Sequence, residues 1–142
     1  MNARFAVLMF LAALSAPLAA QTTAGKSPPL ALKGHDPVAY FTDGRPVRGA
    51  ASMNVDFDDS RYLFASAKNR ELFSASPERY TPQFAGLCAT GMAFGKKAEA
   101  DPSIFVVREG KLYIFSSTEA RDMAQKDPSL LGKSHQAWSK PK

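Results

Sequence analysis

The chain has few side chains that can react with a substrate or bind a transition metal. Its 142 residues include one cysteine, Cys88, and two histidines, His35 and His135. A single cysteine excludes a disulfide within the chain and a zinc site built from four cysteines. After residue 20, no apolar run approaches the roughly 20 residues that a membrane-spanning helix needs. The chemistry open to this chain therefore depends on a small number of residues.

Residues 1–20 have the pattern of an export signal. Arg4 supplies the positive start, an apolar run extends from Phe5 to Leu14, and the mostly small residues 15–20 favour cleavage after Ala20. The apolar run is too short to span a bilayer as a helix. We therefore expect a soluble, periplasmic or secreted protein with no membrane span after signal cleavage. Cleavage after Ala24 and an uncleaved anchor are the alternatives.

The charge of the chain is mildly positive. The formal net charge is +5, and removal of Arg4 with the signal leaves +4. Lysine and arginine are scattered among acidic residues and are not interleaved with aromatic residues, as they are in proteins that bind single-stranded nucleic acid. This pattern predicts no nucleic-acid partner.

The length after cleavage, about 120 residues, is that of one domain with one core. Residues 21–31 are small, polar and proline-containing, which predicts a flexible leader, and residues 32–139 form the predicted domain. We find no internal repeat in the sequence.

The hydrophobic pattern alternates between short strands and short helices. It predicts a strand at 38–41 and two hairpins, one formed by 54–57 with 62–65 and the other by 104–107 with 111–115. It also predicts helices at 67–74, after 76, at 117–125 and after 127. Gly132 is expected to interrupt the last of these helices. We expect an α+β fold, in which short helices pack on a small antiparallel sheet of hairpins within a single domain.

Four segments carry a family resemblance. They are the run GHDPVAYF at 34–41, YLFAS at 62–66, the spaced residues Phe73, Pro77, Tyr80 and Pro82, and GLCA at 86–89. In this order and spacing the chain resembles the YHS-domain family, and more narrowly its exported bacterial branch of YHS domain-containing (seleno)proteins. The resemblance covers about Leu32 to Trp138. It implies the fold, and in the better-known members it implies metal binding through cysteines in D-P-V-C-x-M and Y-H-F-C-S segments.

This chain departs from the family pattern at the metal ligands. Ala39 and Ala65 occupy the positions that match the two cysteines, and Leu63 matches the histidine of the family name. Because soft metals favour sulfur ligands, that metal site cannot be carried over. Some members of the exported branch carry selenocysteine, and its occurrence at the position of Cys88 would favour redox chemistry.

Cys88 is the centre of the remaining hypotheses. It lies in a segment, residues 84–95, that is punctuated by three glycines, which permit close backbone approach and anion-favouring turns. Three interpretations stay open: a small buried hydrophobic residue, a nucleophilic thiol and a metal ligand.

The metal interpretation needs further donors. His35, Cys88 and Met92 together suit copper(I) or another soft metal, and the addition of His135 would complete the ligand inventory of a blue-copper centre. Asp36 either orients the His35 ring or bonds to the backbone of its own turn. A Cys88–His35 pair for hydrolysis lacks a separate orienting residue.

Three functions follow from these residues. The first is soft-metal binding through Cys88 with His35 and Met92. The second is redox chemistry, in which Cys88 forms a sulfenic acid or a mixed disulfide with a partner protein, because the chain has no resolving cysteine. The third is a non-catalytic interaction domain. We expect a binding protein rather than an enzyme, with Cys88 as its one candidate catalytic residue, and the sequence does not indicate an oligomeric state.

Overall fold

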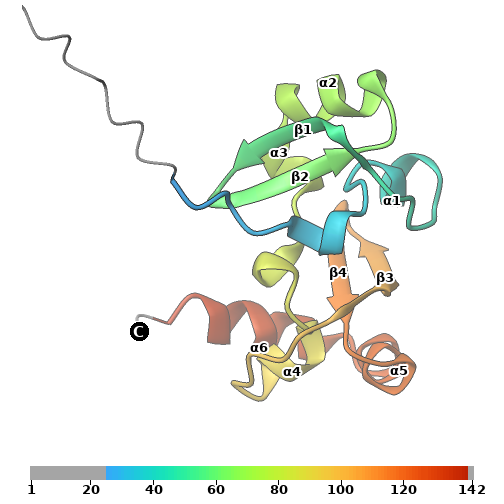
Figure 1. Cartoon of the computed structure of the whole chain (residues 1–142). Coiled ribbons are helices and arrows are strands. Elements are labelled where there is room, and N and C mark those ends of the chain that lie inside the picture. Colours follow the sequence, from blue (N-terminus) through green and yellow to red (C-terminus); the bar gives the residue numbers. More distant parts are fainter. Residues whose placement is uncertain (1–24, 141–142) are drawn as a thin grey trace, which may run out of the picture.

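The computed structural model describes residues 25–140 (Figure 1). The predicted signal and the start of the predicted leader lie outside the described residues. The elements, in chain order, are η1 (Ala31–Gly34), α1 (Ala39–Thr42), β1 (Ala50–Phe57), β2 (Ser60–Phe64), α2 (Ala67–Ala75), α3 (Pro77–Tyr80), η2 (Gln83–Gly86), α4 (Ala89–Ala93), β3 (Asp101–Arg108), β4 (Lys111–Phe115), α5 (Thr118–Lys126) and α6 (Ser129–Trp138). Among the described helices, none combines the length and the apolar character that crossing a bilayer requires.

The predicted α+β fold is confirmed. Each of the two predicted hairpins forms a two-stranded antiparallel sheet, β1 with β2 and β3 with β4. The helices after 66, 76, 117 and 127 are also present, and α6 continues through Gly132 without interruption. The predicted leader ends in a paired segment, because the carbonyl of Pro29 accepts a hydrogen bond from the Arg61 backbone N–H at 2.9 Å.

The expectation that the chain has no internal repeat is wrong. Residues 30–80 and residues 82–138 follow the same order: a 3₁₀ turn, a short helix, a hairpin and two helices. The register of the hairpins repeats as well. Ala50 pairs with Phe64 in the first hairpin. The residues 51 positions later, Asp101 and Phe115, pair in the second. In both hairpins the register shifts directly after this pair. We call these two segments the first and the second repeat.

Local backbone conformation repeats in the same way. The second and third residues of both 3₁₀ turns have positive φ. In η1 the angles are 50° at Leu32 and 49° at Lys33, and in η2 they are 58° at Phe84 and 53° at Ala85. Each turn ends in a glycine with positive φ, Gly34 or Gly86, a conformation that glycine adopts without steric cost. The sequence signal for the repeat is weak, and its clearest trace is YLFAS at 62–66 against YIFSS at 113–117.

The predicted strand at 38–41 is also wrong, because these residues begin a helical turn. The buried carboxylate of Asp36 accepts a hydrogen bond from the Val38 N–H at 2.9 Å, and the Val38 carbonyl accepts one from the Thr42 N–H at 3.1 Å. This local hydrogen bonding turns the chain into α1. It overrides the β propensity of a valine, a tyrosine and a phenylalanine within four residues.

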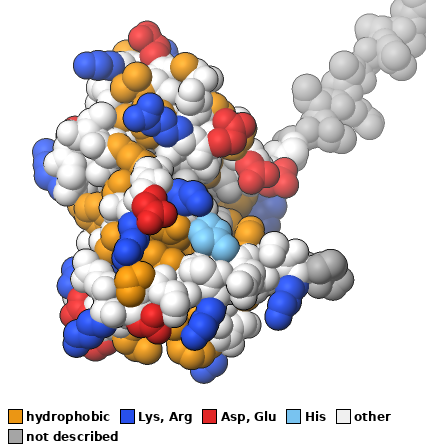
Figure 2. All heavy atoms as spheres, turned by 180° about the vertical axis from the view of Figure 1, so that it is seen from behind, with side chains coloured by type: hydrophobic (Ala, Val, Ile, Leu, Met, Phe, Trp, Pro, Cys, Tyr) orange, Lys and Arg blue, Asp and Glu red, His pale blue; other side chains and the backbone are white. Residues whose placement is uncertain are grey.

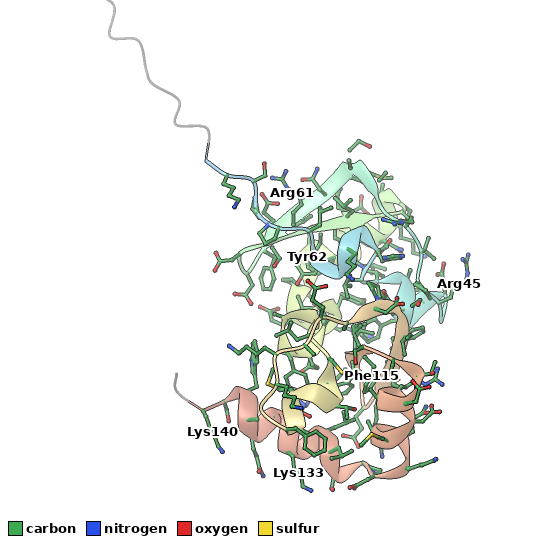
Figure 3. The ribbon with its side chains drawn as sticks, turned by 60° about the horizontal axis from the view of Figure 1, so that its bottom comes forward. Arg45, Arg61, Tyr62, Phe115, Lys133 and Lys140 are labelled. Carbon is green, nitrogen blue, oxygen red and sulfur yellow. The ribbon has the colours of Figure 1, made fainter. Side chains whose placement is uncertain are left out.

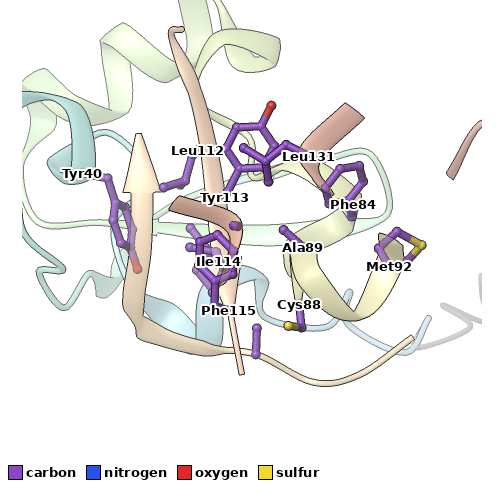
Figure 4. Packing of buried hydrophobic residues seen from close by; sticks show 13 residues of the cluster. Tyr40, Phe84, Cys88, Ala89, Met92, Leu112, Tyr113, Ile114, Phe115 and Leu131 are labelled. Atoms are coloured by element: carbon purple, nitrogen blue, oxygen red, sulfur yellow. The ribbon is translucent and has the colours of Figure 1, made fainter. Parts of the chain in front are cut away.

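Two clusters of buried side chains form the core. One belongs to the first repeat and includes Phe64 and Phe73. The other is built mainly from the second repeat, but it also takes in Leu32 and Tyr40 of the first (Figure 4). Cys88 lies in this second cluster, so the candidate site is part of the packing that joins the two repeats.

Candidate functional site

Cys88 lies at the junction between η2 and α4, where it is 1% exposed. Its backbone N–H donates to the carbonyl of Ala98 at 2.9 Å, and its own carbonyl accepts from the Met92 N–H at 3.0 Å. Both backbone polar groups are therefore satisfied inside the protein, which holds the residue in one place.

The sulfur of Cys88 accepts two hydrogen bonds. The backbone N–H of Gly91 donates to Sγ at 3.4 Å, so the side chain acts as the N-cap of α4. The hydroxyl of Ser116 donates to the same sulfur at 3.3 Å. Because Ser116 itself is exposed, the sulfur lies one side chain below the molecular surface.

Two hydroxyl groups fix α4 against the neighbouring helices. The Thr90 side chain donates to the carbonyl of Ala120, on α5, at 2.6 Å. The Ser134 side chain, on α6, donates to the carbonyl of Ala89 at 2.7 Å. These contacts come from residues at least 30 positions apart and hold the Cys88 segment between α5 and α6.

Asp36 occupies the position in the first repeat that Cys88 occupies in the second. Its carboxylate is fully buried and accepts hydrogen bonds from the Val38 N–H at 2.9 Å, the Ala65 N–H at 2.8 Å and the Asn69 side chain at 2.8 Å. Ser116, which donates to Cys88, lies 51 residues after Ala65. Each repeat thus places a buried acceptor beneath the same part of its hairpin. Asp36 bonds to backbone and amide groups, as a turn aspartate does, and the described hydrogen bonds do not connect it to His35.

The hydrogen bonds described for the Cys88 sulfur do not involve His35, and Met92 is turned away from that sulfur. The Nδ1 of His35 donates to the carbonyl of Leu32 at 2.9 Å, and the ring is half-buried. Met92 is buried, 3% exposed, and Figure 4 shows its sulfur and that of Cys88 on opposite sides of the α4 segment. Soft-metal binding through Cys88 and Met92 together would therefore require Met92 to change its side-chain conformation.

His135 lies in a different environment. Its Nε2 shares a hydrogen bond of 3.0 Å with the hydroxyl of Tyr113, and its ring lies 4.9 Å from that of Phe84. Burial, and then the charge of Lys111, lower the pKa of His135. Within residues 25–140, no three side chains of His, Cys, Asp or Glu are grouped to hold a metal ion. The four donors of a blue-copper centre are therefore not brought together.

A cavity of about 220 Å³ lies between the two repeats, and sequence reasoning missed it. We call it the inter-repeat cavity. Its walls come from the β1–β2 turn, from β2, from residues 81–85 and from α6, and they include Asp58, Tyr62, Gln83, Phe84, His135 and Trp138. Figure 3 shows Tyr62 in the half that the first repeat forms, above the helix that carries Lys133. The many aromatic residues of the chain were the one sequence signal, but they do not reveal which of them line a cavity.

Comparison of the chain with protein-family models, with curated proteins and with solved structures finds no match. The resemblance to the YHS domains stays a prediction from the sequence, and the function is inferred from the residues of this chain.

Proposed function

We propose that this chain is an exported YHS-like domain in which Cys88 is a redox-active thiol. The observation that carries the proposal is the pair of hydrogen bonds donated to its sulfur, from the Gly91 N–H and the Ser116 hydroxyl. The nucleophilic form of cysteine is the thiolate, and donors aimed at the sulfur are of the kind that stabilise negative charge there.

The position of the sulfur suits a small oxidant. The Cys88 side chain is 1% exposed, so a bulky reagent has no direct access. We expect a small oxidant to reach the sulfur past the exposed Ser116 side chain, whose hydroxyl contacts it. A peroxide therefore reaches the thiol more easily than a folded protein does, and a mixed disulfide with a partner protein would form in a second step.

The chemistry needs a peroxide as oxidant. The thiolate attacks one oxygen of hydrogen peroxide, an S–O bond forms as the O–O bond breaks, and hydroxide leaves. Sulfur loses two electrons, the peroxide gains them, and the product is the sulfenic acid. A partner thiol then condenses with the sulfenic acid, which forms a disulfide and releases water. No resolving cysteine in the chain competes, because Cys88 is the only one.

The test is peroxide oxidation of the folded protein, followed by removal of the peroxide, denaturation in the presence of dimedone to trap sulfenic acid, and mass spectrometry of the intact chain. We expect one adduct on the native protein and none on Cys88→Ser, which keeps a side-chain acceptor for the Gly91 N–H. An adduct that forms only when the protein is denatured before the peroxide is added would show that the native thiol is inert, and the redox proposal would be withdrawn.

Soft-metal binding through Cys88, His35 and Met92 stays a prediction, and one observation favours it. In neutral His35 the Nδ1 carries the proton that it donates to the Leu32 carbonyl, so Nε2 keeps its lone pair. This is the arrangement in which protein histidines bind metals. Copper(I) retained in native mass spectrometry by the wild type and lost from Cys88→Ser would favour the metal function over the redox function. A non-catalytic interaction domain is the remaining candidate if both tests are negative.

A further inference from the structure

The inter-repeat cavity has aromatic walls contributed by both repeats. Tyr62 and Phe84 are 5% and 3% exposed, and Trp138 at the end of α6 is 45% exposed. The rings of Phe84 and Trp138 lie 6.0 Å apart at a steep angle. Faces of aromatic rings carry partial negative charge and attract cations, most strongly at tryptophan and tyrosine.

The charge of the cavity is negative, although the chain as a whole is positive. Among the described residues that line the cavity, Asp58 is the sole side chain with a full charge at neutral pH, since the lowered pKa of His135 keeps its ring neutral. Burial, and then the charge of Asp58, raise the pKa of Tyr62 to about 12. The Asp58 carboxylate is therefore close enough to act on the Tyr62 hydroxyl.

Tyr62, which lines the cavity, has a hydroxyl that is open to solvent. Within the described structure this hydroxyl makes no hydrogen bond to another side chain or to the backbone, and no fully buried side-chain polar atom is left unpaired. A hydroxyl without a protein partner therefore reaches solvent-accessible space, and the cavity is the space that Tyr62 lines. It offers a polar group beside the aromatic walls.

The second repeat supplies an internal comparison. Its cavity of about 200 Å³ is lined by Tyr113, the counterpart of Tyr62, and by Glu109, the counterpart of Asp58. However, Arg108 and Lys111 also line it, so its net charge is positive. The combination of aromatic walls with an unopposed carboxylate is therefore found at the inter-repeat cavity and not at its counterpart. Figure 2 shows the molecule from behind, with acidic side chains of the upper half above the projecting end of α6 and a histidine side chain between them.

From these observations we propose that the inter-repeat cavity binds a small organic cation, a quaternary or methylated ammonium group, with the exposed ring of Trp138, the Tyr62 hydroxyl and the carboxylate of Asp58 as its contacts. The volume of about 220 Å³ is below the usual range for drug-sized ligands, which restricts the ligand to a small molecule or a single cationic head group. The binding is independent of the chemistry of Cys88, because that residue does not line the cavity.

The test uses choline as the probe and Trp138 as the reporter. Trp138 is the only tryptophan of the chain, so its fluorescence reports the cavity without labelling. We expect a saturable change in Trp138 emission with a dissociation constant on the order of 1 mM or tighter. The neutral isostere 3,3-dimethylbutan-1-ol should bind at least about tenfold more weakly, because it has the shape of choline without its charge.

Asp58→Asn and Asp59→Asn form a matched pair of variants. Both residues have positive φ in the two-residue β1–β2 turn, 47° and 59°, a conformation that asparagine adopts readily. Both variants should therefore keep the turn, and circular dichroism checks this. We expect Asp58→Asn to weaken choline binding roughly fivefold or more, and Asp59→Asn to change it less than about twofold, since Asp59 does not line the cavity.

Three outcomes would overturn the proposal. They are the absence of saturable binding at choline concentrations of tens of millimolar, which lies far above the expected constant, equal affinity for choline and its neutral isostere, and equal effects of the two variants. Isothermal titration calorimetry on the same proteins separates binding from collisional quenching of Trp138. Because the readout does not involve Cys88, failure of this test leaves the redox proposal untouched.

Discussion

At the scale of the residue, the two repeats have different buried hydrogen-bond acceptors at the same position. In each repeat a buried side chain accepts one hydrogen bond from a backbone N–H at the start of a short helix. It accepts another from the residue that follows the hairpin. Asp36 does so with a carboxylate and three donors, and Cys88 does so with a sulfur and two. The carboxylate forms the stronger, charge-assisted bonds, so the first repeat relies on this residue for stability. The weaker acceptor in the second repeat leaves its side chain available for chemistry.

Replacement of Asp36 by alanine should destabilise the protein strongly. The change leaves the Val38 N–H, the Ala65 N–H and the Asn69 amide without their acceptor in a fully buried position. We expect a loss of about 3 kcal/mol in the free energy of unfolding, measured by chemical denaturation. Asp43→Ala, at an exposed position, is the control and should change stability by about 0.5 kcal/mol or less. Similar values for the two variants would contradict the importance assigned to the Asp36 hydrogen bonds.

At the scale of the element, the helices and hairpins depend on glycine in different ways. Gly49 precedes β1, and a Cβ built on it would overlap the backbone of Leu63, with its carbonyl oxygen only 2.6 Å away. Gly132 lies inside α6, and a Cβ there would meet no atom within 4 Å. The first glycine is required by a close approach of two backbone segments, whereas the second has no such role.

Alanine at these two positions should therefore have opposite effects. Gly49→Ala should lower the free energy of unfolding by about 2 kcal/mol, because the β1–β2 pairing must shift to admit the methyl group. Gly132→Ala should raise it by about 0.5 to 1 kcal/mol, since alanine loses less conformational entropy in a helix. Thermal melts of the two variants beside the wild type test both signs. A destabilised Gly132→Ala would mean that α6 packs more closely than described.

The elements also show how far local sequence determines structure. The hairpins were predictable because each consists of two short runs rich in β-branched and aromatic residues on either side of a short polar turn. The helix starts at 67 and 118 were predictable because Ser66 and Ser117 cap them through their own side chains. Residues 38–41 were not predictable, since the acceptor that turns them into a helix is itself held by Ala65 and Asn69.

At the scale of the whole molecule, the repeats share a core instead of standing as two separate domains. The Tyr40 hydroxyl, in the first repeat, donates to the carbonyl of Pro102 in the second at 2.9 Å. The Tyr40 ring packs edge-on against that of Phe105, with centroids 4.8 Å apart. Loss of either repeat would therefore expose apolar surface on the other.

This shared core predicts a single cooperative unfolding transition. In guanidinium chloride, the far-UV circular dichroism of the whole chain and the fluorescence of Trp138 in α6 should follow one curve with the same midpoint. A fluorescence midpoint well below the circular dichroism midpoint would instead show that the second repeat unfolds on its own. The measurement on Asp36→Ala, where the first repeat is weakened, should still give coincident curves at a lower midpoint.

The sequence by itself determined the fold class, most of the hairpins and helix caps, and the absence of a disulfide within the chain, because these follow from local patterns and from the cysteine count. Only the tertiary structure decided that the chain is a repeat, that Cys88 is buried beneath Ser116, that His35, His135 and Cys88 are not grouped, and that a cavity lies between the repeats. The physical reason is distance along the chain. Ser116 and Cys88 are 28 residues apart, and Tyr40 and Pro102 are 62 apart, so their contacts arise from packing that no local pattern encodes.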